Sequence, residues 1–292
     1  MSSALMSRPS LGVAGDLPPE KKRGLATRGV QWARNHMTQF FAALVLLYMF
    51  LPVMVVVVFS FNEPVGRTNY TWTKFSFDAW PGLFQDPEII DSVVLSLQIG
   101  LVATAVSTVL GTLIAFAVGR HRFRGRAATN LLIFMPMATP EVVLGASLLS
   151  LFIQAGRDGD LGPVTITIAH IMFCISFVVV TVKARIAGLD PRLEQAAMDL
   201  YANERTTFWK VTFPLALPGI VAGALLAFSL SFDDFVITNF TSGQTITFPM
   251  YVWGAATRGI PPEANVVGSA MFLIALVIVL VPELTRRRSK TA

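Results

Sequence analysis

The sequence predicts an all-α integral membrane protein with about six transmembrane helices, and two observations support this fold class. Apolar residues make up 53% of the 292 residues and charged residues only 14%, whereas an ordinary soluble domain carries about 25% charged residues. The chain also contains six stretches, each with at most one charged residue, that reach or nearly reach the roughly 20 residues needed to cross a bilayer. Because backbone groups in lipid must be hydrogen-bonded internally, these stretches are expected to be helices.

Charged residues mark the ends of the apolar stretches and set the expected boundaries. Residues 1–37 precede all of them, are polar, include the pair Pro18-Pro19, and are expected to form a disordered cytoplasmic arm. Residues 285–292 are expected to form a basic cytoplasmic tail. One transmembrane domain is expected over 38–284, with spans at 38–61, 91–119, 127–155, 162–184, 213–238 and 264–284.

The distribution of basic residues predicts that both termini are cytoplasmic. With the N-terminus inside, all but four of the 23 basic residues fall in cytoplasmic segments, as the positive-inside rule favours. The basic clusters each flank a span, which argues against nucleic-acid binding as their purpose. The first apolar stretch is too long for a signal peptide, and no small-residue cleavage site follows it. The four basic residues left outside are Arg67, Lys74, Arg157 and Arg258.

Small residues recur at every fourth position of two expected spans. This spacing places them on one helix face, where two backbones can approach closely. Tight helix packing is the favoured interpretation, and a lining of a solute path is the alternative. The second span carries Ala103, Ser107, Gly111, Ala115 and Gly119, and the fifth carries Gly219, Gly223, Ala227 and Ser231.

The longest cytoplasmic connection, at about 185–212, contains an amphipathic stretch that lies outside the spans. Helix formers run from Leu193 through Asp199, and a second helical segment is expected to follow a turn and to end at Pro214. A helix between two spans has no lipid-facing role here. It is therefore expected to dock in a groove of a cytoplasmic partner.

This loop resembles the Glu-Ala-Ala loop of permeases from binding-protein-dependent ABC importers. Ala196, Ala197 and Pro214 match the family pattern, whereas Gln195 replaces its carboxylate and Glu194 stands one residue earlier. Tyr201 occupies the position of the family glycine, where a positive φ would strain any other residue. The resemblance implies a helix over about 191–203 that couples the permease to an ATPase. The implied coupling residues are Glu194, Gln195, Ala196, Ala197, Asp199, Leu200 and Tyr201.

From about residue 45 to 284 the chain resembles the second permease of spermidine/putrescine importers. The resemblance implies the type I ABC importer fold and import of polyamines across the bacterial inner membrane. It also implies four kinds of partner: a second permease, two copies of an ATP-binding subunit, an extracytoplasmic solute-binding protein and membrane lipid. Matching segments include FSFN at 59–62, RHRFRGR at 120–126, MATPEVVLGASLL at 137–149, HIMFCISFVVVTVKARI at 170–186, FSLSFDDFVITNF at 228–240 and PPEAN at 261–265.

Three carboxylates fall within the expected spans, where a charge is costly and usually functional. Glu141 follows Pro140 in the third span, and Asp233 and Asp234 lie near the outer end of the fifth. A polycationic solute would give all three a purpose along its path. The structural alternatives are that Glu141 satisfies backbone donors freed by the prolines and that the aspartates cap a broken helix. On an intact helix, Asp233 is the one favoured to face the path.

The other residue types indicate no reaction chemistry. None of the six lysines follows a glycine, which excludes a phosphate-binding P-loop, so ATP hydrolysis is expected on partner subunits. The single cysteine, Cys174, and the three histidines show no ligand spacing, and no metal or cofactor is expected. The alternatives left open are an importer of another small organic solute, a proton-coupled secondary transporter and a membrane enzyme.

Overall fold

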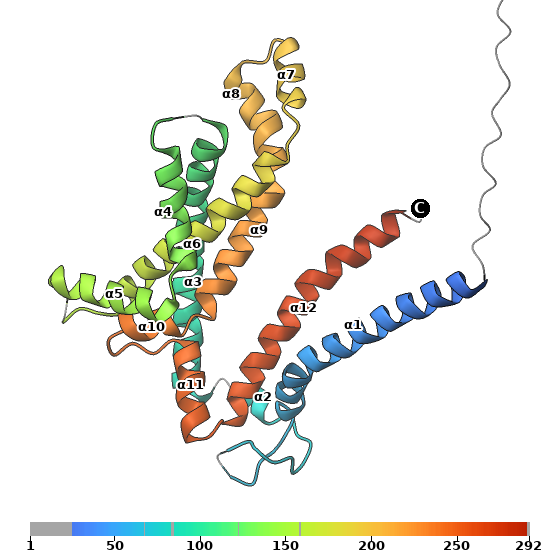
Figure 1. The fold of residues 1–292 in the computed structure, drawn as a ribbon. Coiled ribbons are helices and arrows are strands. Elements are labelled where there is room, and N and C mark those ends of the chain that lie inside the picture. Colours follow the sequence, from blue (N-terminus) through green and yellow to red (C-terminus); the bar gives the residue numbers. More distant parts are fainter. Residues whose placement is uncertain (1–24, 67, 83–84, 122, 158, 291–292) are drawn as a thin grey trace, which may run out of the picture. The chain divides into compact units, whose positions relative to one another are not determined.

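The computed structural model describes residues 25–66, 68–82, 85–121, 123–157 and 159–290 (Figure 1). Over these residues the chain is helical, and its one extended pairing is an isolated bridge between Asn62 and Phe75. Residues 1–24 of the predicted arm lie outside the described residues. The helices are α1 (Leu25–Phe59), α2 (Ala79–Gly82), α3 (Pro87–Arg120), α4 (Arg126–Ala138), α5 (Glu141–Gln154), α6 (Pro163–Ala187), α7 (Arg192–Asp199), α8 (Glu204–Thr207), the π-helical turn η2 (Phe208–Thr212), α9 (Phe213–Phe232), α10 (Val236–Thr241), α11 (Phe248–Arg258) and α12 (Pro262–Lys290).

The chain divides into two units, Met1–Val55 and Val56–Ala292. In the first unit, α1 begins at Leu25, earlier than the expected span start at 38. The side chains described there are exposed except for the half-buried Val53, and they include a long series of leucines, valines and phenylalanines. A helix that is apolar on all sides and exposed in the isolated chain is suited to lipid or to another membrane helix.

Four helical segments among the described residues are long and apolar enough to cross a membrane. They are His36–Phe59, Pro87–Arg120, Pro163–Ala187 and Glu204–Phe232, and the bent pair α4–α5 raises the number to five if it counts as one span. The apolar part of α12 that the structure describes, Pro262–Val277, is shorter. The chain is thus a multi-span helical protein, and the count of six spans stays a prediction.

The third and fifth expected spans are each broken into two helices, at the prolines that mark the third and at the aspartate pair of the fifth. Between α4 and α5 the axis turns by 106°. Thr139 there takes an extended conformation, as expected for a residue before proline, and Pro140 has no N–H to donate. In the fifth span, α9 ends at Phe232 and a separate short helix, α10, begins at Val236. The two short helices made by these breaks, α5 and α10, pack on each other (Figure 1).

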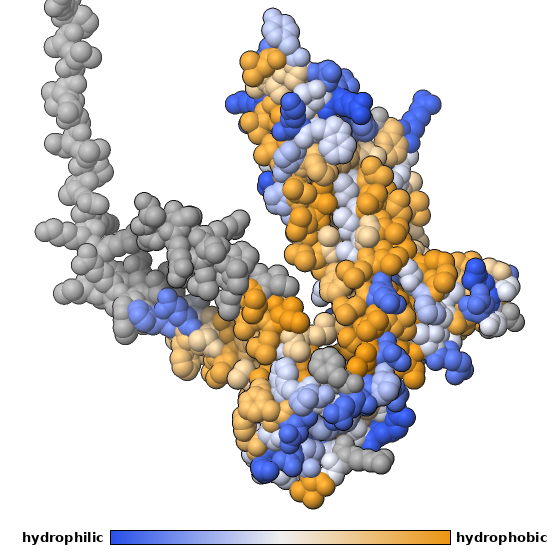
Figure 2. Space-filling view, turned by 180° about the vertical axis from the view of Figure 1, so that it is seen from behind, coloured by the Kyte–Doolittle hydropathy of each residue, from blue (hydrophilic) through white to orange (hydrophobic). Residues whose placement is uncertain are grey.

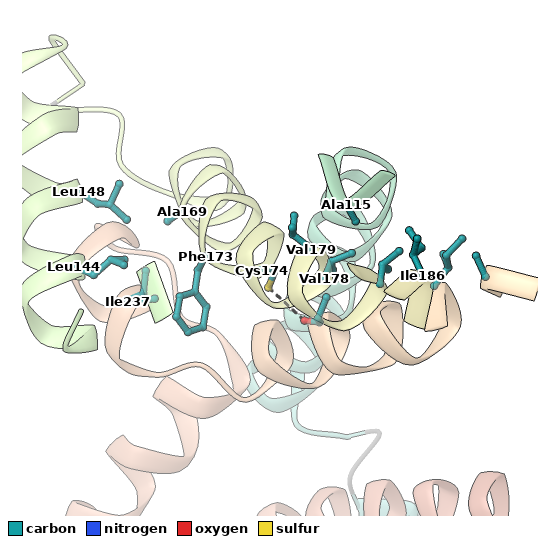
Figure 3. Close-up of a cluster of buried hydrophobic side chains, with 14 of the residues drawn as sticks. Ala115, Leu144, Leu148, Ala169, Phe173, Cys174, Val178, Val179, Ile186 and Ile237 are labelled. Carbon is teal, nitrogen blue, oxygen red and sulfur yellow. Dashed lines mark hydrogen bonds between the residues drawn. The ribbon is translucent and has the colours of Figure 1, made fainter. Parts of the chain in front are cut away.

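The core of the second unit lies where α3, α6 and α9 pack together. Figure 3 shows Cys174, Val178 and Val179 of α6 in this cluster, with Ala115 of α3 nearby. A Cβ added at Gly111 would lie only 2.7 Å from Val178 Cγ1, so glycine is what allows α3 to approach α6. The other members of the second-span stripe from Ala103 to Ala115 are buried. The packing interpretation of the small residues is confirmed.

The surface of this bundle changes character along its length. Figure 2 shows hydrophobic side chains over the α3, α6 and α9 bundle and hydrophilic ones gathered around the end that carries α7 and α8. Exposed apolar residues on α3 and α9, such as Leu113 and Leu225, belong to the hydrophobic band. This arrangement fits helices that cross a bilayer and a loop that stands outside it.

Candidate functional site

The α7–α8 segment forms a helix–turn–helix at one end of the bundle (Figure 1). At its start, the Asp190 Oδ1 accepts a hydrogen bond of 3.0 Å from the Arg192 N–H. At the start of α8, the Asn203 Oδ1 accepts one of 2.8 Å from the Thr206 N–H. Both side chains satisfy donors that a helix N-terminus leaves open. Hydrogen bonds to neighbouring side chains therefore stabilise the starts of both short polar helices.

The turn between the two helices is built on Tyr201, the one non-glycine residue among those described with a positive φ, at 63°. The Tyr201 N–H donates to the Met198 carbonyl at 2.9 Å, and the Ala202 N–H donates to the Ala197 carbonyl at 3.1 Å. These two bonds make the Schellman motif that ends many helices, usually with glycine at this position. The left-handed conformation costs a tyrosine about 1–2 kcal/mol. Tyr201 therefore adopts the positive φ expected of a glycine at this position, and the turn geometry that the sequence left open is the left-handed one.

The predicted coupling residues do not all point the same way. No residue of α7 is buried, and its end is open to solvent, with Leu200 82% exposed and Tyr201 99% exposed. Gln195, Ala196 and Asp199 are also exposed, whereas Ala197 and Glu194 are partly covered. The loop thus offers an exposed tip and one face that turns towards the bundle.

Glu194 lies on the inward face and binds two other helical segments. Its Oε2 accepts a hydrogen bond of 2.9 Å from the Arg120 Nη1, and its Oε1 accepts one of 2.7 Å from the Arg120 Nη2. The Thr212 hydroxyl donates to the same Oε1 at 2.7 Å. The sequence predicted that Glu194 couples the loop to an ATPase, and it indicated no role for Arg120 or Thr212. Arg120 is one of four arginines in its segment, and nothing in their spacing singles it out.

An open hollow of about 640 Å³ lies beside this pair, between the end of α3 and the α7–α8 segment. Its walls combine aromatic rings with both signs of charge. The lining residues are Phe116, Arg120, His121, Glu194, Met198, Glu204, Arg205, Thr207, Phe208 and Thr212.

A second polar cluster lies where the fifth span breaks. The Asp234 Oδ2 accepts hydrogen bonds from the Thr238 N–H at 2.7 Å and from its hydroxyl at 2.8 Å, so Asp234 caps α10. It also lies 3.3 Å from the Nε2 of His170 on α6. The His170 Nδ1 is 2.7 Å from the Ser231 hydroxyl. The sequence indicated no role for His170, because its partners are brought to it only by packing of α9 and α10 on α6.

The other two candidate carboxylates occupy different surroundings. Asp233 ends α9 and is exposed, so the favoured choice of Asp233 on an intact helix does not apply to the broken one. Glu141 is the first residue of α5 and is exposed. Within the described residues, no side-chain hydrogen bond caps the start of α5. Glu141 therefore does not satisfy backbone donors at the start of α5 in this structure. Asp234, in contrast, does cap the helix that follows the break in the fifth span.

The family described as "Binding-protein-dependent transport system inner membrane component" matches residues 107–288. The "Spermidine/putrescine transport system permease protein PotC" of Haemophilus influenzae is 34% identical over 258 residues, covering 88% of this chain and 99% of the relative. The "Putrescine transport system permease protein PotI" of Escherichia coli is 37% identical over 224 residues, covering 75% of this chain and 79% of the relative.

Solved structures show the same fold at low identity. A chain from a bacterial ABC transporter involved in the import of the acidic polysaccharide alginate superposes with a TM-score of 0.60 at 18% identity. The match covers 90% of this chain and 98% of that one. A second structure, of a bacterial alginate ABC transporter in complex with a pentasaccharide-bound periplasmic protein, gives a TM-score of 0.63 at 16% identity, covering 89% and 96%. At these identities the likeness concerns the fold alone.

Proposed function

This chain belongs to the family of binding-protein-dependent transport system inner membrane components, and from that premise we propose that it is a permease subunit of an ATP-driven importer of polyamines. The observation that carries the permease role is the α7–α8 segment, a helix–turn–helix with an exposed tip whose two helix starts donate hydrogen bonds to Asp190 and Asn203. The polyamine assignment rests on relatives that are named for spermidine and putrescine. An importer of another small organic solute is the alternative.

The proposed topology follows from charge and apolar length. The chain is a multi-pass membrane protein, and we propose six spans, with both termini and the α7–α8 segment in the cytoplasm of a bacterium and the spans in its inner membrane. The basic cluster from Arg120 to Arg126, at the same end of the bundle as α7, supports this orientation.

The proposed partners are a second permease, two ATP-binding subunits and an extracytoplasmic solute-binding protein. The tip of α7 would enter a groove of an ATP-binding subunit and contact it through Gln195, Ala196, Ala197, Asp199, Leu200 and Tyr201. An exposed tyrosine and leucine at the end of a short helix are suitable anchors for such a groove. Closure of the ATP-binding subunits would then displace α7.

The three carboxylates have two different roles in this proposal: one stabilises the fold, and two lie along the route of the solute. Asp234 has its oxygens occupied by Thr238 and His170 and holds the break between α9 and α10. Glu141 and Asp233 are exposed and offer negative charge to a polyamine along its route. A cation that leaves water needs such compensating charge, because its desolvation is costly.

The chain itself is proposed to carry no ATPase site, and reconstitution tests this division of labour. The purified chain alone should hydrolyse no ATP. With its partners in vesicles, ATP hydrolysis should be stimulated by the solute-loaded binding protein, and radiolabelled spermidine should accumulate. Uptake by this chain alone under a proton gradient would instead establish a secondary transporter, and uptake of another solute in place of spermidine would overturn the polyamine assignment.

A further inference from the structure

The contact between Glu194 of α7 and Arg120 at the end of α3 has a use beyond docking. We propose that Arg120, Glu194 and Thr212 form a clasp that transmits movement of α7 directly to α3, so that Glu194 is a positioning residue for energy coupling and not part of the surface that touches the ATPase. The inference rests on the proposed function of the chain as an ATPase-coupled permease.

The clasp matters because little else ties α7 to the bundle. The helix has eight residues and none of them is buried. Among the residues that the structure describes, Glu194 supplies the side-chain hydrogen bonds that join α7 to other helical segments. An open hollow lined by residues of both α3 and α7 lies beside the Arg120–Glu194 pair. Apolar packing therefore does not hold this helix in place, and the Glu194 contacts carry that role.

The geometry of the pair suits the transmission of a displacement. Arg120 meets Glu194 through two parallel hydrogen bonds of 2.9 and 2.7 Å, and such a bidentate pair restricts the relative rotation of its partners. The two side chains are 29% and 23% exposed, so neighbouring groups partly shield the pair from water. The Thr212 hydroxyl adds a third bond at 2.7 Å and links the same carboxylate to the turn that leads into α9.

The position of α3 decides where a displacement would go. Glu194 lies on the loop between α6 and α9, to which α7 is already joined through the chain, whereas α3 precedes that loop in sequence. The α3 helix packs on both α6 and α9 through its buried small residues. A second contact to α3, the 5.3 Å ring pair of Phe116 and Phe208, starts from η2 and bypasses α7. A displacement of α7 would thus act on all three core helices, on α6 and α9 through the chain and on α3 through the clasp.

Three single variants and one double variant test the clasp in the reconstituted complex with its binding protein and partners. Glu194→Gln and Arg120→Gln remove one charge each, and Arg120→Lys keeps the charge but loses the two-pronged geometry. The exchange Arg120→Glu with Glu194→Arg restores an ion pair. The matched control is Arg124→Gln, which removes an exposed charge from the same arginine cluster. Each variant is measured for ATPase co-purification, for ATP hydrolysis and for spermidine taken up per ATP hydrolysed.

The clasp predicts that the three single variants assemble and hydrolyse ATP, while spermidine taken up per ATP falls by roughly fivefold or more, the low end of typical coupling between sites. The exchange variant should recover most of the loss, and Arg124→Gln should behave as wild type. Unchanged uptake per ATP in the single variants overturns the proposal. Loss of ATPase co-purification in Glu194→Gln, with Arg120→Lys unaffected, overturns it too, because Glu194 would then be a docking contact. A wild-type complex that takes up no spermidine refutes the proposed function instead.

Discussion

Gly111 of α3 and Gly223 of α9 face Val178 of α6 and provide a matched pair of substitutions. A methyl group added at Gly111 would lie 2.7 Å from Val178 Cγ1 and 2.8 Å from its Cβ, closer than carbon atoms approach without a shift of the neighbour. A methyl group at Gly223 would lie 3.6 Å from Val178 Cγ1, which is ordinary van der Waals contact. Gly111→Ala should therefore force α3 and α6 apart, and Gly223→Ala should be accommodated.

The comparison of the two variants isolates the packing contribution. Each replaces glycine by alanine within a helix, so the difference in helix propensity, about 1 kcal/mol, cancels between them. The Val178 Cβ is attached directly to its backbone and cannot rotate away, so relief requires movement of a helix. Overpacking of this kind costs about 1–3 kcal/mol. We expect Gly111→Ala to be less stable than Gly223→Ala by this amount.

Thermal unfolding of the detergent-solubilised protein measures the difference. Gly111→Ala should melt below the wild type, while Gly223→Ala should melt at the wild-type temperature or above it. Expression and membrane insertion of both variants serve as controls. Equal melting temperatures for the two variants would refute the close approach of α3 to α6 at Gly111, and with it the arrangement that lets α3 pass a displacement to the core.

Four further predictions concern the loop and the carboxylates. Ala197→Asp adds a charge on the partly covered side of α7, so ATPase co-purification should drop while membrane insertion persists; unchanged co-purification and transport would exclude docking by α7. Tyr201→Gly removes a strain of about 1–2 kcal/mol together with an exposed ring, so the chain should melt no lower than wild type while its affinity for the ATPase subunit falls; a lower melting temperature would mean that the ring packs within the chain. Glu141→Gln and Asp233→Asn should each reduce uptake of radiolabelled spermidine several-fold with assembly intact, and normal uptake by both would remove these residues from the path. Asp234→Asn weakens a buried acceptor of several hydrogen bonds and should cost about 1–3 kcal/mol in thermal unfolding; a wild-type melting temperature would contradict its capping role.

Local features of the chain were predictable because their causes are local. The long helices α3 and α6 follow from apolar length, since lipid requires internal hydrogen bonding of every backbone group. The family pattern marked Tyr201 as the residue that stands where glycine is usual, and the structure decided that it keeps the positive φ. The break in the third span was signalled by Pro136 and Pro140, although the 106° bend it produces was not. Hydropathy depends on the residue types along the chain and contains no information on the direction of the helix axis, so it does not predict a bend angle.

The break of the fifth span gives Asp233 and Asp234 different surroundings that the sequence did not predict. Asp233 and Asp234 are adjacent and chemically identical, and on an intact helix neither has an evident reason to cap. The structure ends α9 before them, leaves Asp233 exposed and buries Asp234 against His170. This difference depends on α6, whose histidine supplies a partner for one aspartate and not for the other. No pattern within the fifth span contains that information.

The sequence by itself determined the helical membrane class of this protein, the place of the loop that contains α7 and α8, and the residues of the proposed coupling surface. The tertiary structure decided which of these residues meet. Arg120 and Glu194 are 74 positions apart, and His170 and Ser231 are 61 apart. Such pairs form only after α3, α6 and α9 have packed through their small residues, because that packing sets the rotation of each helix about its axis. Composition and spacing specify one helix at a time, whereas a contact between two helices depends on the orientation of both.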